Sequence, residues 1–74
     1  MATTAASRAA LRDEARQALL TYLQAQGSRA AGADAVRAVA ANLGVSPSAI
    51  VAAMWSLVDE GTVEYDDGAQ LALA

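Results

Sequence analysis

The side chains able to do chemistry in this chain are carboxylates, arginines and hydroxyls, because its 74 residues include no cysteine and no histidine. Disulfides, Cys/His metal sites, cysteine nucleophiles and Ser-His-Asp triads are therefore excluded. Glu64, Asp66 and Asp67 lie close in sequence, and such clusters can bind hard cations. The run Asp66-Asp67-Gly68, however, is more typical of a tight hairpin turn. The sequence also shows no glycine-rich phosphate loop and no nucleophile motif. We expect no enzymatic activity, no cofactor, no metal and no small-molecule substrate.

All the basic residues are arginines, and the net charge is −3. The five cations that could contact nucleic acid or an acidic partner are Arg8, Arg12, Arg16, Arg29 and Arg37. The first three are spaced by four and follow one side of a predicted helix. This stripe indicates either a binding surface or a solvated helix face, on which Asp13 pairs with Arg16. DNA-binding domains usually gather positive charge on one face, so the acidic balance disfavours DNA as a partner.

Apolar spacing and helix-ending signals predict three helices. They cover about Ser7–Gln26, Ala33–Leu43 and Pro47–Glu60. The apolar stripe expected on the first helix is Leu11, Ala15, Ala18, Leu19 and Tyr22. Gly27, Gly44 and Gly61 follow the three helices and are expected to end them. Ser46 is expected to cap the third helix through its hydroxyl, with Pro47 in the first helical position.

After Gly61 the period changes to that of a β-hairpin. Thr62–Tyr65 alternates, Asp66–Gly68 favours a turn, and Gln70–Leu73 can return as the second strand. Residues 28–31 are compatible with a β-bridge of one or two residues. An isolated hairpin is unstable in water, so this one must pack on the helices. We expect one domain over residues 8–74, with residues 1–7 forming either a flexible terminus or the start of the first helix.

The order of these elements resembles the winged helix-turn-helix family. The resemblance covers residues 10–73 and is carried by Ala40, Leu43, Gly44, Val45, Ile50, Met54, Leu57, Gly61 and Val63. It implies an α+β, mainly α fold, in which three helices precede a C-terminal β-hairpin wing. This fold serves DNA-binding regulators, protein-interaction modules and dimerisation domains alike, so it does not fix the function.

In the DNA-binding members of this family the third helix enters the major groove and the wing touches the DNA backbone or the minor groove. The positions here that would face DNA are Pro47, Ser48, Val51, Ala52, Trp55 and the wing tip Asp66–Gly68. The third helix carries no Arg, Lys, Asn or Gln, the side chains that read base edges in pairs of hydrogen bonds. The wing offers carboxylates where phosphates would lie. Both features argue against DNA.

The third helix is apolar over more than half of its circumference. Its core side is formed by Ile50, Ala53, Met54 and Leu57, and a second row by Val51, Trp55 and Val58. In one interpretation Val58 packs under the wing, Val51 packs against the second helix and Trp55 is half-buried. In the other, the second row is an exposed patch that binds a protein partner or a second copy. Leu20 is a further surplus apolar residue, either part of such a surface or simply exposed.

Together these features predict a non-catalytic interaction module that makes protein–protein contacts or forms a homodimer through the third helix. A bacterial or phage DNA-binding transcriptional regulator is the alternative. Heavy use of alanine and arginine without lysine is typical of high-GC bacterial or phage genomes. We expect a cytoplasmic protein without a membrane span, since no signal-peptide pattern and no run near 18 apolar residues is present.

Overall fold

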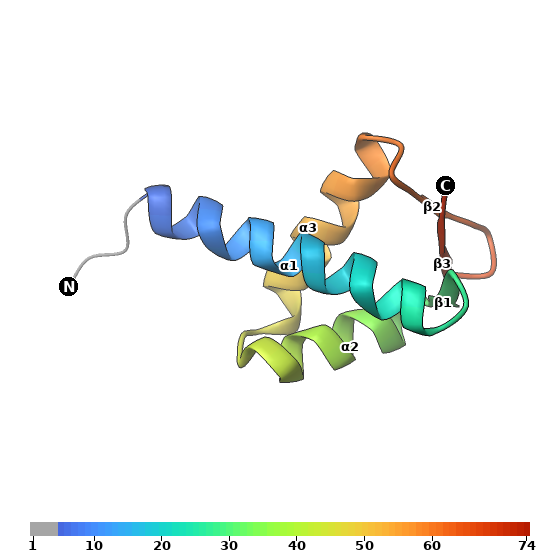
Figure 1. The fold of residues 1–74 in the computed structure, drawn as a ribbon, viewed down its shortest axis with the longest axis horizontal. Helices are drawn as coiled ribbons and strands as arrows, with labels where there is room; N and C mark the ends of the chain where they lie inside the picture. Colours follow the sequence, from blue (N-terminus) through green and yellow to red (C-terminus); the bar gives the residue numbers. More distant parts are fainter. Residues whose placement is uncertain (1–4) are drawn as a thin grey trace.

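The computed structural model describes the backbone of residues 5–74 and the side chains of residues 10–74. Its helices are α1 (Ala5–Ala25), α2 (Gly32–Leu43) and α3 (Pro47–Asp59), and its strands are β1 (Arg29–Ala31), β2 (Val63–Tyr65) and β3 (Gln70–Leu73). Helix α1 crosses in front of α3, and the strands gather at the end of the molecule where α1 stops (Figure 1). The expected mainly helical α+β class is confirmed. Of residues 1–7, residues 5–7 belong to α1, and residues 1–4 lie outside the described chain.

The three strands form one antiparallel sheet in the order β1-β3-β2. The expected hairpin is present, with Glu64 opposite Ala72. Strand β1 pairs with the other edge of β3, placing Ala30 opposite Leu71. The sequence allowed only a bridge of one or two residues there, whereas the structure has a strand of three. A third strand and a helical layer supply the support that a two-stranded hairpin lacks.

The ends of the helices agree with the glycine signals but not with the predicted serine cap. Gly27, Gly44 and Gly61 have φ angles of 78°, 68° and 78°, a left-handed conformation that glycine adopts without steric cost. Ser46 occupies the N-cap position of α3 in an extended conformation, yet its hydroxyl makes no capping hydrogen bond. Its Oγ lies 3.1 Å from the Oγ of Ser48 instead. The predicted capping hydrogen bond is therefore wrong, because the neighbouring hydroxyl takes its place.

The hydrophobic core lies where the three helices meet the sheet. The largest fully buried side chains are Leu19, Leu23, Ile50, Leu57, Leu71 and Val63. On α1 the buried row is Ala15, Leu19 and Leu23, whereas Tyr22 is only partly buried. The expected stripe on α1 was thus wrong in omitting Leu23, which continues the row by one turn. No helix in the described part of the chain combines the length and the hydrophobicity needed to cross a lipid bilayer.

Candidate functional site

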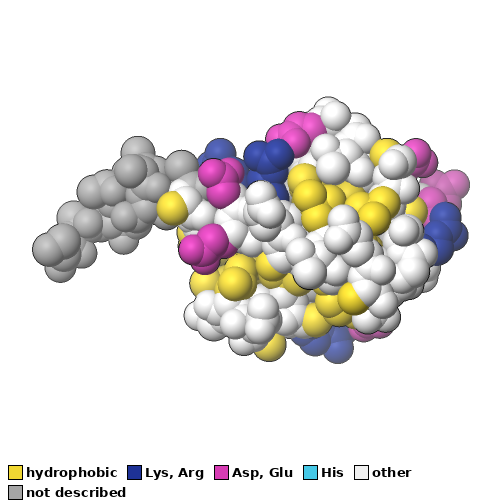
Figure 2. All heavy atoms as spheres, viewed as in Figure 1, with side chains coloured by type: hydrophobic (Ala, Val, Ile, Leu, Met, Phe, Trp, Pro, Cys, Tyr) yellow, Lys and Arg dark blue, Asp and Glu magenta, His cyan; other side chains and the backbone are white. Residues whose placement is uncertain are grey.

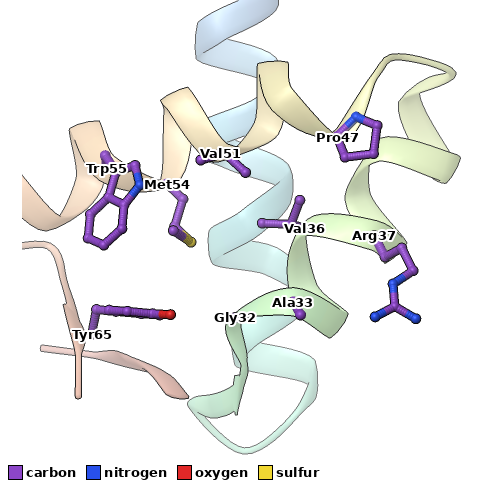
Figure 3. Close-up of a pocket in the computed structure, with 9 residues that line it drawn as sticks. All are labelled: Gly32, Ala33, Val36, Arg37, Pro47, Val51, Met54, Trp55 and Tyr65. Atoms are coloured by element: carbon purple, nitrogen blue, oxygen red, sulfur yellow. The ribbon is translucent and has the colours of Figure 1, made fainter. Parts of the chain in front are cut away.

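A groove of about 460 Å³ lies between α2 and α3. Its lining residues are Gly32, Ala33, Val36, Arg37, Pro47, Val51, Met54, Trp55 and Tyr65. Trp55 and Tyr65 stand at one end of the groove, and Pro47 and Arg37 at the other (Figure 3). The volume is within the range of ligand and peptide pockets, and the walls are almost entirely apolar. The polar side-chain groups of its lining residues are the Arg37 guanidinium, the Tyr65 hydroxyl and the indole N–H of Trp55.

The aromatic end of the groove is an edge-to-face pair. The ring centroids of Trp55 and Tyr65 are 5.1 Å apart, and the ring planes meet at 73°. This is a favourable arrangement for two aromatic side chains. Trp55 nevertheless keeps 44% and Tyr65 39% of its surface exposed, and these are the exposed large hydrophobic residues of the described chain. Two aromatic rings are thus held in a fixed arrangement without being removed from solvent.

Tyr65 can lie in this position because α2 begins with a glycine. A Cβ atom on Gly32 would come 3.0 Å from Cε1 of Tyr65, closer than Cβ atoms normally approach a neighbour. The amide of Gly32 also donates a hydrogen bond of 2.8 Å to the carbonyl of Ala69, which fixes the start of α2 against the β2–β3 turn. Tyr65 was missed as a site residue by sequence reasoning. The available signal was its position two residues after the buried Val63, on the same face of β2.

The structure separates the four predicted interaction residues. Val51 and Trp55 both line the groove, with Val51 partly buried. Val58 and Leu20 do not line it, and both are partly buried against the hydrophobic core. The candidate site is therefore the row of Val51 and Trp55, together with the α2 wall and Tyr65, rather than the whole second row of α3.

Among residues 10–74 the arginines come from separate places in the fold, and on the face drawn in Figure 2 the dark-blue groups lie apart from one another. The expected pair of Arg16 with Asp13 is present at 4.0 Å. Arg16 also forms an ion pair with Glu60, which joins α1 to the end of α3. Arg29 lies 3.6 Å from a carboxylate oxygen of Asp66. Two of the four guanidinium groups in residues 10–74 are thus already engaged by carboxylates of the same chain.

The other predicted cations have different surroundings. Arg37 is exposed at the polar end of the groove, and Arg12 is exposed on α1. Among the side chains of residues 10–74, neither forms an ion pair. The side chain of Arg8 lies outside the described residues, so only two members of the predicted stripe can be placed. The cation nearest to the candidate site is therefore Arg37.

The acidic β2–β3 turn is built by hydrogen bonds within the chain. The Oδ1 atom of Asp66 accepts hydrogen bonds from the amides of Gly68 at 2.9 Å and Gln70 at 3.0 Å. This carboxylate closes the turn, as expected for the Asp66–Gly68 run. Within the described residues, no three Asp or Glu side chains come close enough together to hold a metal ion.

Comparison with known proteins identifies no relative of this chain. It matches no protein-family model, no curated protein and no solved structure. The function of the groove is therefore argued from its own geometry and chemistry.

Proposed function

We propose that this chain is a winged-helix module that contacts another protein through the groove between α2 and α3, and that it catalyses no reaction. The observation that carries the proposal is the exposed indole of Trp55 beside an apolar groove, on the third helix. Three helices followed by a hairpin, with that hairpin packed on the helices, support the winged-helix assignment. In this assignment the hairpin β2–β3 is the wing.

The chemistry of the groove favours a protein surface as its occupant. Tryptophan and tyrosine are enriched at the centres of protein interfaces, where they supply a large contact area at a low entropic cost. Here the two rings contact each other and Tyr65 also lies against Gly32, and such contacts reduce the side-chain freedom that binding would have to remove. Val36 and Met54 are buried residues that also line the groove and add to its apolar surface.

A DNA-binding regulator is the alternative, and the arrangement of charges argues against it. Helix α3 presents Ser48, Ala52 and Trp55 to solvent, none of which can read a base by paired hydrogen bonds. Arg16 and Arg29 are bound to carboxylates of the chain, and Asp66 and Asp67 are exposed at the proposed wing. Any contact with nucleic acid would rest on a few dispersed arginines.

Photocrosslinking from α3, the helix that forms one wall of the groove, tests the proposal. A photoreactive amino acid replaces Ala52, which is exposed on α3, and in a matched control it replaces Gln24, which is exposed on α1. We expect a discrete adduct with a protein that mass spectrometry identifies, formed from position 52 and not from position 24. Adding Trp55→Ala should abolish that adduct. Equal crosslinking from both positions, or crosslinking from position 52 to nucleic acid, would contradict the proposal.

A further inference from the structure

We infer that the protein bound at this groove is a second copy of the same chain, with the two α3 helices packed antiparallel across a two-fold axis. The inference rests on the proposed function and names its partner. It is carried by the order of side chains along the exposed row of α3 and by the positions of two charged residues, Arg37 and Asp59.

The exposed row of α3 is apolar in its middle and charged at its ends. Pro47, Val51, Trp55 and Asp59 are spaced by four, so they form a row that extends over about 18 Å and turns around the helix by about 40° at each step. Arg37 reaches the row at the Pro47 end of the groove (Figure 3). Asp59 ends the row at the other end, one turn beyond Trp55. The face therefore has a cation at one end and an anion at the other, separated by an apolar centre.

Both charges are exposed and lack a partner within the described structure. Among the side chains of residues 10–74, neither Arg37 nor Asp59 forms an ion pair. Asp59 is also the last residue of α3, and no basic residue lies in that last turn. A carboxylate at the negative end of a helix dipole is unfavourable, and a cation placed there is favourable. Arg16 of α1 pairs with the neighbouring Glu60, and a guanidinium from another molecule would further offset the charge of Asp59.

A two-fold axis between Val51 and Trp55 matches every member of the row with a complementary one. In a symmetric dimer the same patch meets itself in reverse, so the patch must be complementary to itself. Antiparallel packing places each Trp55 against the partner's Val51 over the groove. It also brings each Asp59 to the partner's Arg37. An unrelated protein would not require opposite charges at the two ends of the apolar row, whereas a self-complementary face does.

Charge exchange between two variants tests this arrangement. Arg37→Glu gives a face with acid at both ends, and Asp59→Arg gives a face with arginine at both ends. Each variant alone should repel its own copy and dimerise about tenfold or more weakly than the unmodified chain, since two pairs change from attraction to repulsion. An equimolar mixture restores both pairs and should form the heterodimer. Light scattering and native mass spectrometry at about 50 mM salt, where screening is weak, measure the masses.

Matched controls carry the same changes of charge on α1. Arg12→Glu and Glu14→Arg alter exposed residues outside the groove and should dimerise as the unmodified chain does. Circular dichroism of all four variants checks that each is folded. If the unmodified chain stays monomeric at about 1 mM, its affinity for a second copy is weaker than that of a specific interface, and the inference is overturned. A mixture that forms no more dimer than the single variants would overturn the inference as well. Crosslinking from Ala52 to a different protein would overturn the inference and leave the proposed function standing.

Discussion

Gly32 and Tyr65 show how one missing side chain shapes the groove. The ring of Tyr65 lies where a Cβ on Gly32 would be 3.0 Å from Cε1, and the same ring forms the edge-to-face pair with Trp55. Gly32 has no left-handed backbone conformation, so its lack of a side chain matters here for space rather than for φ. A methyl group at this position should therefore displace the ring and disturb the aromatic end of the groove.

A double-mutant cycle between these two residues tests that contact. We compare the change in the free energy of unfolding that Gly32→Ala causes in two backgrounds. In the unmodified chain this change should be about 1 kcal/mol more destabilising than in a Tyr65→Ala background, because only the unmodified chain contains the ring. Without the ring, alanine should be the better residue at the start of a helix. Urea denaturation of the four proteins measures the coupling. An equal effect of Gly32→Ala in both backgrounds would show that the ring does not rest on the glycine.

At this scale the sequence identified Trp55 as a surplus aromatic residue but did not identify Tyr65. The helical wheel of α3 shows that Trp55 lies off the core side, and this required only the spacing of neighbouring residues. The position of Tyr65 depends on a close approach between two segments 33 residues apart, which no local pattern describes. The same reason explains Arg16, for which the sequence predicted the local pair with Asp13 but not the distant one with Glu60.

At the scale of elements, the uncertain feature of the sequence was the rotation of α1. Alanine is frequent on this helix and favours helix without marking which side is buried, because it has little surface to bury. The predicted stripe therefore ended at Tyr22, whereas the buried row runs through Leu19 to Leu23. Strand β1 was uncertain for a related reason, since a three-residue strand with two alanines forms only because the edge of β3 is available.

Truncation of two leucines on α1 tests its orientation. Leu23 is fully buried, so Leu23→Ala should cost about 2–5 kcal/mol and leave much of this small domain unfolded. Leu20 is only partly buried at the edge of the core, and Leu20→Ala should cost about 1 kcal/mol. Urea denaturation of each variant, monitored by the helical circular dichroism signal at 222 nm, gives the midpoints that compare the two substitutions. A larger loss for Leu20→Ala would mean that α1 packs with another face.

For the whole molecule, the distribution of charge supports the proposed protein partner over DNA. The chain has a net charge of −3, the arginines among residues 10–74 are dispersed, and the groove between α2 and α3 is lined mainly by apolar side chains. Attraction to phosphates is long-ranged and requires positive charges clustered on one surface. Contact with an apolar protein face requires instead a complementary shape and apolar area from which water can be excluded. The surface of residues 10–74 has the features of the second class.

A titration of labelled duplex DNA at about 50 mM salt makes this distinction quantitative. Proteins that bind DNA even without specificity do so with dissociation constants of about 1–100 μM at physiological salt, and more tightly at lower salt. We expect no change in fluorescence polarisation at about 100 μM of this chain, because its acids repel phosphates and only Arg12 and Arg37 are exposed without an ion pair among the described side chains.

A less acidic variant provides the control for that titration. Replacing Glu64 by Gln and Asp67 by Asn changes the net charge from −3 to −1 and leaves the turn-forming Asp66 intact. If the acidic side chains of the β2–β3 hairpin merely masked a DNA-binding surface, this variant should bind, and its affinity should fall steeply with salt. We expect it to remain unbound, because α3 still presents an indole and small side chains where a reader of DNA needs cations and amides. Salt-sensitive binding by the unmodified chain would instead make DNA the partner of this fold.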